Sequence, residues 1–168
     1  MAHAQPKFES IKNTTYGIVF LGTPHRGSDL ASLAETVAKI ASVAFGKRKI
    51  QTQLLKTLRE NSQQLQDLAE EFTELHSLYK IVTCFEQKKT AFSKGFFSKT
   101  EIVVPESSAK LAIEGETLVA MNTDHRNICK FDSRDDSQYA KVKNRIAELA
   151  NEAPDAVKTR LKPGNVPT

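Results

Sequence analysis

Apolar positions along the chain alternate between short continuous runs and longer stretches at helical spacing. Gly17–Leu21 is uninterrupted, as in strands that are buried on both faces of a parallel sheet, and Ile81–Phe85 and Ile102–Val104 are two further β-branched runs. From Leu30 onward, apolar residues recur every three or four positions, a spacing typical of covering helices. Strands that alternate with helices predict an α/β architecture with a parallel sheet.

The helical stretches also predict how the domain is organised. Residues 1–15 predict the end of a helix and a loop, and amphipathic helices are expected over about 30–46 and 50–78. A last helix has four apolar residues on one face: Tyr139, Val142, Ile146 and Leu149. Beyond it the chain turns polar and contains Pro and Gly. We therefore expect one domain over 1–150 and a polar, disordered tail over 151–168.

Composition limits the classes of protein that remain. A chain of 168 residues with 39% hydrophobic and 26% charged residues is typical of one globular domain. No apolar run reaches the roughly 20 residues that span a bilayer, and no secretory signal is visible at the N-terminus. Cys84 and Cys129 lack the spacing of a metal or redox site. They predict reduced thiols in an intracellular, cytoplasmic protein that holds no metal or cofactor.

The net charge of +4 is spread over separate basic segments. No dense basic face or nucleic-acid reading element appears, so we expect no nucleic-acid partner. One segment, 89–99, interleaves Phe and Lys residues around Gly95: Phe92, Phe96 and Phe97 with Lys89, Lys94 and Lys99. Exposed Phe beside Lys predicts a peripheral membrane contact, whereas a loop that tucks its Phe residues into the core is an equal alternative.

Candidate chemistry gathers where the expected strands end. The turn Gly22–Ser28 follows the first strand, and open α/β sheets bind their ligands at such turns. Glu86 ends the second strand and His125 lies in a later polar loop, so both are expected at the same sheet edge. An acid followed by a histidine is the order that α/β-hydrolases use after their serine. In such a pair the carboxylate accepts the imidazole N–H and stabilises the imidazolium.

Other residues compete for both roles. Taken singly, a glutamate at a strand end is more often a solvated residue, and a lone histidine is more often structural. Three further acids are candidates: Glu106, Asp124 and Asp132. Asp124 adjoins His125, and neighbouring side chains diverge, which makes it a poor orienter. His25 precedes every candidate acid and lies in a tight turn.

Three ordered motifs resemble one family. Tyr16–Ser28, Val103–Ala109 and Asn122–Phe131 resemble the motifs of serine-active-site-containing (SERAC-type) lipases, which are α/β-hydrolases. Similar domains stand at the N-terminus of fungal NACHT, ankyrin and tetratricopeptide-repeat proteins. The resemblance covers about residues 13–140. It implies a lipid or acyl-ester substrate and association with endoplasmic-reticulum or mitochondrial membranes.

The same resemblance implies roles for two residues, but the sequence departs from the family in its nucleophile motif. It implies that His125 is the catalytic histidine and Glu86 the acid. The family carries its nucleophile in a Gly-His-Ser-x-Gly-Gly elbow before the first of these motifs, but no Gly-x-Ser-x-Gly occurs in this sequence. We therefore expect the C-terminal half of an α/β-hydrolase fold, with about three parallel strands, covering helices and an incomplete sheet. The sequence reads as a truncated gene model or as a fragment that pairs with another.

No other residue is expected to supply the nucleophile. Ser28 suits a helix N-cap, Ser107–Lys110 is a weak Ser-x-x-Lys pattern without its companion motifs, and nothing activates Cys129. The chain alone is therefore expected to be inactive. Its first strand would form an exposed apolar edge, which predicts self-association or pairing with a missing N-terminal half. The alternative is a non-catalytic interaction or signalling module derived from a hydrolase domain.

Overall fold

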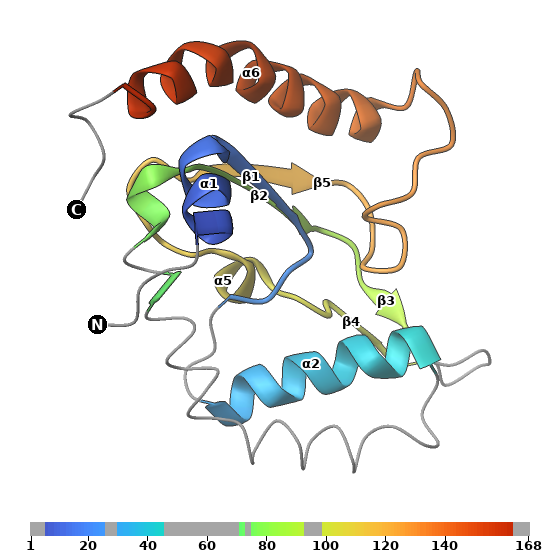
Figure 1. The fold of residues 1–168 in the computed structure, drawn as a ribbon. Helices are drawn as coiled ribbons and strands as arrows, with labels where there is room; N and C mark the ends of the chain where they lie inside the picture. The colour runs from blue at the N-terminus through green and yellow to red at the C-terminus, as the bar shows by residue number, and fades with distance from the viewer. Residues whose placement is uncertain (1–5, 26–29, 46–70, 73–74, 93–98, 163–168) are drawn as a thin grey trace.

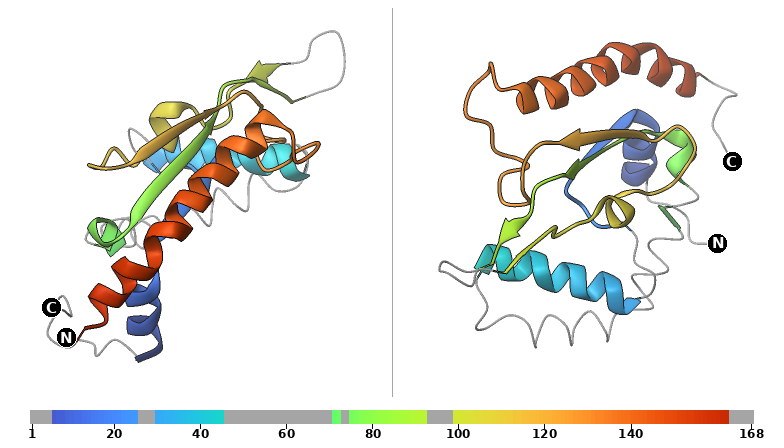
Figure 2. Two further views of the ribbon diagram at one scale, coloured as in Figure 1. Left: turned by 90° about the horizontal axis from the view of Figure 1, so that it is seen from above. Right: turned by 180° about the vertical axis from the view of Figure 1, so that it is seen from behind.

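A three-stranded parallel sheet forms the centre of the molecule. The computed structural model describes residues 6–25, 30–45, 71–72, 75–92 and 99–162. The strands are hydrogen-bonded in the order β1 (Gly17–Leu21), β2 (Lys80–Glu86) and β5 (Thr117–Met121). α6 (Ser137–Arg160) lies over one face of the sheet and α2 (Leu30–Phe45) over the other (Figure 1). The view from behind shows the same layers (Figure 2), so the expected α/β fold with covering helices is confirmed.

β2 is the central strand, and every one of its residues after Lys80 is buried. Its register with β1 places Leu21 opposite Cys84, and its register with β5 places Met121 opposite Glu86. All three strands run in the same direction, so their carboxyl ends meet at one edge. Among the described strands β1 has β2 as its one neighbour, and all five of its residues are half-buried.

The core has one layer on each face of the sheet. Between the sheet and α6, the buried residues are Val82, Cys84, Val119, Met121, Ile128 and Val142. Under α2 and the short helix α5 (Glu106–Ala109), they are Phe85, Val103, Val104 and Ala109. Cys84 and Phe85 belong to opposite layers, as the two-residue period of a strand requires. The centre of the sheet is thus buried on both sides, as the apolar runs predict.

The prediction of a third strand at Ile102–Val104 is wrong. β4 (Thr100–Glu101) instead pairs antiparallel with β3 (Thr90–Ala91) in a separate two-stranded sheet. The third parallel strand is instead β5, the apolar segment that precedes the His125 loop. The apolar run at Val103 and Val104 reflects burial below α2 rather than a strand. Their backbone N–H groups donate to the Glu86 side chain and not to a neighbouring strand.

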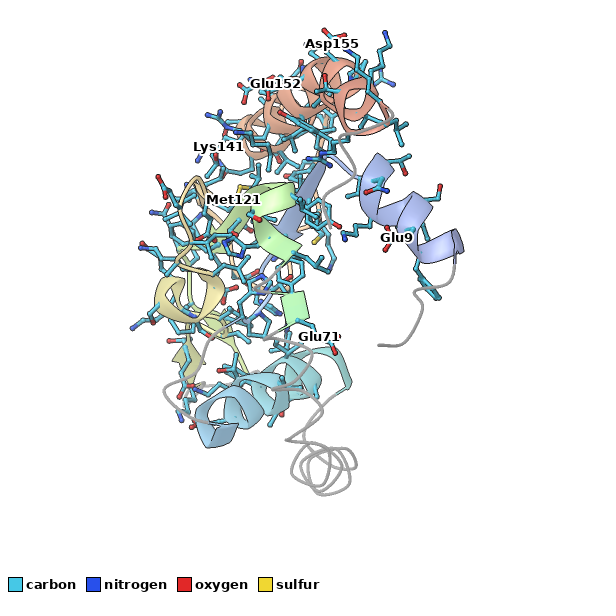
Figure 3. The ribbon with its side chains drawn as sticks, turned by 60° about the vertical axis from the view of Figure 1, so that its left-hand side comes forward. Glu9, Glu71, Met121, Lys141, Glu152 and Asp155 are labelled. Atoms are coloured by element: carbon cyan, nitrogen blue, oxygen red, sulfur yellow. The ribbon has the colours of Figure 1, made fainter. Side chains whose placement is uncertain are left out.

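The chain does not turn into a disordered tail at residue 151, because α6 continues to Arg160 with Pro154 inside the helix. The guanidinium of Arg160 donates to the carbonyl oxygens of Thr15 and Leu78, and the Tyr16 hydroxyl donates to Glu152 at 2.7 Å. Figure 3 shows Glu152 on α6. These long-range bonds hold a polar helix that composition alone would leave unfolded. The prediction is therefore wrong over residues 151–160.

The remaining elements flank the sheet. α1 (Pro6–Thr14) confirms the helix expected at the start of the chain, and the 3-10 turn η1 (His76–Leu78) leads into β2. Most of the helix expected over 50–78 lies outside the described residues, as do Ser28, Phe96 and Phe97. Phe92 packs against the core layer under α2, as the alternative to membrane contact requires.

Glu116, just before β5, organises the loop that follows α5. Its carboxylate accepts the Thr83 hydroxyl at 2.7 Å and the backbone N–H groups of Leu111 at 3.0 Å and Ala112 at 2.9 Å. Ala112 has a positive φ of 54°, which is unusual for a residue with a β-carbon. The carboxylate therefore stabilises both the buried hydroxyl of β2 and a strained loop.

Replacing Glu116 by Ala should destabilise the protein because it leaves three donors without their acceptor. We expect the free energy of unfolding to fall by about 1–3 kcal/mol in chemical denaturation. The matched control is Glu114→Ala, which removes an exposed carboxylate two residues away and should change stability by no more than about 0.5 kcal/mol. Equal effects of the two substitutions would contradict this account.

Candidate active site

The carboxyl edge of the sheet brings Glu86 and His125 into contact. Glu86 is the last residue of β2, and His125 lies four residues after β5 ends at Met121. The distance from His125 Nδ1 to Glu86 Oε2 is 2.8 Å, which is a hydrogen bond. The two residues that the sequence nominates are thus adjacent in space, although they lie 39 positions apart in the chain.

Glu86 is held by three hydrogen bonds in a site without solvent exposure. Its side chain is 0% exposed. Oε1 accepts the backbone N–H groups of Val103 at 2.7 Å and Val104 at 2.9 Å, while Oε2 faces His125. Burying a carboxylate is costly unless it is hydrogen-bonded, and these donors meet that requirement. The carboxylate therefore has one fixed orientation, with one oxygen left for the imidazole.

His125 is fixed at its backbone and at one ring nitrogen. Its backbone N–H donates to the Thr90 hydroxyl at 3.1 Å, and Thr90 is itself fully buried. Because a carboxylate faces Nδ1, that nitrogen carries the proton, and Nε2 of the neutral ring is an acceptor. Nε2 has no hydrogen-bond partner among the described residues, and the ring remains 12% exposed. The free nitrogen is the one that a general base requires.

An open groove of about 490 Å³ borders the imidazole. Ile40 and Val43 of α2 form its apolar wall. His125, Arg126 and Lys130 line the other side, and both cationic side chains are exposed. The groove thus offers an apolar surface beside His125, with two exposed cationic residues in its lining.

The competing acids make other contacts. Asp124 accepts the backbone N–H of Asn127 at 3.1 Å and its side-chain amide at 2.7 Å, so it caps the turn that carries His125. Glu106 forms an ion pair with Lys110. The backbone N–H of Asp132 donates to the Asp136 carboxylate at 3.4 Å. Of these acids and Glu86, only Glu86 has a described hydrogen bond to the His125 ring.

No described contact joins His125 to the residues that could replace the missing serine as nucleophile. Ser107 is an exposed residue of α5, and Lys110 is paired with Glu106 rather than with Ser107. Cys129 is an exposed free thiol. Nothing in the part of the chain that the structure describes activates either group.

His25 is a feature whose environment the sequence did not reveal. Its ring lies edge-on to Phe20, with 4.3 Å between ring centroids, and its backbone N–H donates to the Ser108 carbonyl at 2.8 Å. Nε2 is buried and has no hydrogen-bond partner within the described ranges. Burial lowers the pKa of His25 below its usual value, and the negative charge of Glu116 partly opposes this shift. His25 is thus a partly buried histidine whose surroundings disfavour the charged ring.

No three His, Cys, Asp or Glu side chains of the described residues gather as a metal site would need. No helix over the described ranges combines the length and apolarity needed to cross a membrane.

Comparison with curated proteins finds SERAC1. The mouse and human proteins are each 30% identical to this chain over 149 residues, which cover 88% of the chain and 21% of the relative. Bovine SERAC1 is 30% identical over 143 residues, which cover 84% of the chain and 20% of the relative. No family model matches the chain, and no solved structure matches it significantly.

These matches support a distant relationship to SERAC1 over most of the chain. The chain spans about a fifth of the length of the curated relatives it matches. All three relatives are mammalian, so the fungal repeat-protein context stays a prediction. The roles of Glu86 and His125 likewise remain predictions that the geometry now makes specific.

The two thiols should differ sharply in reactivity. Burial, with a smaller effect of Cys129, raises the pKa of Cys84 to about 11, whereas the Cys129 thiol is exposed. Iodoacetamide near pH 8 should therefore alkylate Cys129 in the folded protein and leave Cys84 unmodified. Mass spectrometry of native and denatured samples checks this, since both thiols should react after unfolding. Equal labelling in the folded protein would contradict the burial of Cys84.

His25 should make the protein less stable in acid. Its pKa is depressed in the folded state, so the unfolded chain gains a proton first as the pH falls below the ordinary value of 6.5. The contribution of neutral His25 to the free energy of unfolding is fully present above pH 6.5 and is lost as the pH falls toward the folded-state pKa. Denaturation at about pH 7.5 and about pH 5 should therefore show that His25→Phe loses less stability in acid than the unmodified chain. An identical loss would contradict this.

Proposed function

We propose that this chain carries the acid and the general base of a serine hydrolase that acts on acyl esters. One observation carries the proposal: His125 Nδ1 lies 2.8 Å from the buried carboxylate of Glu86, while Nε2 has no hydrogen-bond partner among the described residues. The distant similarity to SERAC1 supports it, as do the three motifs that resemble SERAC-type lipases.

In the proposed reaction His125 moves the protons. Nε2 accepts the hydroxyl proton of a serine as that oxygen attacks the ester carbonyl, and the negative charge of Glu86 stabilises the resulting imidazolium. The imidazolium then donates this proton to the departing alkoxide. The alcohol leaves, and the acyl group remains bound to the serine as an acyl-enzyme. Water attacks this acyl-enzyme by the same path, giving its proton to His125, which returns it to the serine.

The groove supports an acyl ester as the substrate class. Ile40 and Val43 would contact the acyl chain, and their position beside His125 would place the ester near Nε2. Such apolar walls with a few polar groups are typical of small-molecule sites.

The serine is proposed to come from outside these residues. The sequence contains no Gly-x-Ser-x-Gly, and neither Ser107 nor Cys129 has a described contact with His125. β1 offers an unpaired edge among the described strands, and its half-buried apolar residues suit a further parallel strand. We propose that the segment or chain with the nucleophile pairs along this edge, and that these residues alone are inactive.

The test begins with the longest reading frame that contains this sequence. We expect it, or a co-expressed neighbour, to encode Gly-x-Ser-x-Gly, and the resulting protein to react with a fluorophosphonate probe. In that protein, His125→Gln and Glu86→Gln should each lower ester hydrolysis by about 10⁴-fold or more. Glu86→Gln keeps an amide oxygen for the N–H groups of Val103 and Val104, so the fold should survive.

Matched controls separate the pair from general damage. Glu106→Gln alters an exposed acid of α5, and His76→Gln alters a histidine of η1 at the start of β2; both should keep near-normal activity. Fluorophosphonate labelling of the 168-residue chain itself would overturn the proposal that the nucleophile lies elsewhere. A complete protein without any reactive serine would favour the non-catalytic interaction module instead.

A further inference from the structure

We infer that Gly22 is a positioning residue for His125, because the missing side chain at Gly22 makes room for the imidazole beside Glu86. This inference rests on the proposed function only for its catalytic consequence. A β-carbon added at Gly22 would lie 3.2 Å from both Cε1 and Nδ1 of His125 and 3.4 Å from Cδ1 of Ile128. The first two distances are shorter than ordinary van der Waals contact, so the ring or the loop would have to move.

The backbone at Gly22 cannot easily retreat from the ring. Its N–H donates to the Cys84 carbonyl at 2.9 Å, which extends the contact of β1 with β2 by one residue. Gly22 also adopts a φ of +60°, a conformation that residues with a β-carbon rarely take. The loop after β1 is therefore held against the central strand at the point where it meets His125.

The ring has little freedom to move aside while keeping its bond to Glu86. Nδ1, one of the two atoms nearest to the added carbon, is the atom that lies 2.8 Å from Glu86 Oε2. The His125 backbone is bonded to the buried Thr90 hydroxyl, and Ile128 is itself buried in the core. A displaced ring must therefore rotate, which lengthens or misaligns the Nδ1–Oε2 hydrogen bond and weakens it.

Gly115 supplies a matched control within the same chain. Its φ of +79° imposes a similar backbone requirement, but a β-carbon there would meet no atom within 4 Å. Substituting Ala at Gly22 or Gly115 thus causes a similar backbone penalty, and only the change at Gly22 crowds the imidazole. Any difference between the two variants in the state of His125 comes from that contact.

The test measures the His125 ring by NMR in the 168-residue chain, with no need for activity. Two-bond and three-bond proton–nitrogen correlations report which ring nitrogen carries the proton. In the unmodified chain and in Gly115→Ala, we expect Nδ1 to be protonated and Nε2 to be bare. In Gly22→Ala, we expect a mixture of both tautomers and loss of the hydrogen-bonded Nδ1 proton signal. Identical ring signals in the two Ala variants would overturn the inference.

A second pair of variants covers the case in which Gly22→Ala does not fold. Asn accepts positive φ more readily than Ala and still carries a β-carbon, so Gly22→Asn and Gly115→Asn repeat the comparison with less strain. Retention of the Nδ1 proton signal in folded Gly22→Asn would contradict the inference. In the complete protein, Gly22→Ala should also lower kcat about tenfold or more relative to Gly115→Ala. If neither Gly variant nor His125→Gln changes hydrolysis while the NMR difference persists, the proposed function fails and the positioning role stands.

Discussion

The buried carboxylate of Glu86 is the interaction on which the rest of the carboxyl edge depends. It lies at the end of the fully buried part of β2 and receives N–H groups from the segment before α5 and the ring of His125 from the loop after β5. A buried carboxylate must find donors, because an unpaired charge in the interior is far more costly than the loss of a single hydrogen bond. The requirement therefore fixes two loops at once, together with the orientation of the histidine.

Glu116 performs the corresponding task after α5. Glu86 binds the backbone of Val103 and Val104 on one side of this short helix, and Glu116 binds Leu111 and Ala112 on the other. Both carboxylates are attached to the central sheet, Glu86 as part of β2 and Glu116 through the Thr83 hydroxyl. α5 is a helix of four residues, too short to be stable alone. It is held because the segments on both sides are bonded to the sheet.

These side-chain bonds explain where sequence patterns succeed and fail. The runs at Gly17–Leu21 and Ile81–Phe85 predict strands correctly because continuous apolarity reflects burial on both faces of the sheet. The same reasoning fails at Val103 and Val104, which are equally apolar and buried but satisfy their N–H groups with a glutamate. An apolar run indicates that its residues are buried, but it does not indicate which acceptor their backbone N–H groups bind. α6 likewise extends beyond its apolar stripe because Arg160 binds carbonyls that are distant in sequence.

The candidate site was predictable in identity but not in its supporting contacts. The order of Glu86 and His125 along the chain, with strand ends at one sheet edge, brings them together by topology alone. The proximity of Gly22 to the ring depends on the path of a loop and on a positive φ, neither of which has a signature beyond the glycine itself. The same holds for His25, whose buried Nε2 depends on how its loop packs against Phe20.

The two histidines at this edge show which contact distinguishes a candidate base from a structural residue. Each has an Nε2 without a hydrogen-bond partner among the described residues. In His25 that atom is buried, burial lowers the pKa, and no described hydrogen bond joins the ring to a carboxylate. In His125 the carboxylate of Glu86 lies against Nδ1, and the ring borders an open groove. In the proposed reaction, a proton that Nε2 of His125 accepts would leave the Glu86 carboxylate 2.8 Å from the opposite nitrogen. The contact with Glu86 and the open groove therefore single out His125, rather than His25, as the candidate base of the proposed function.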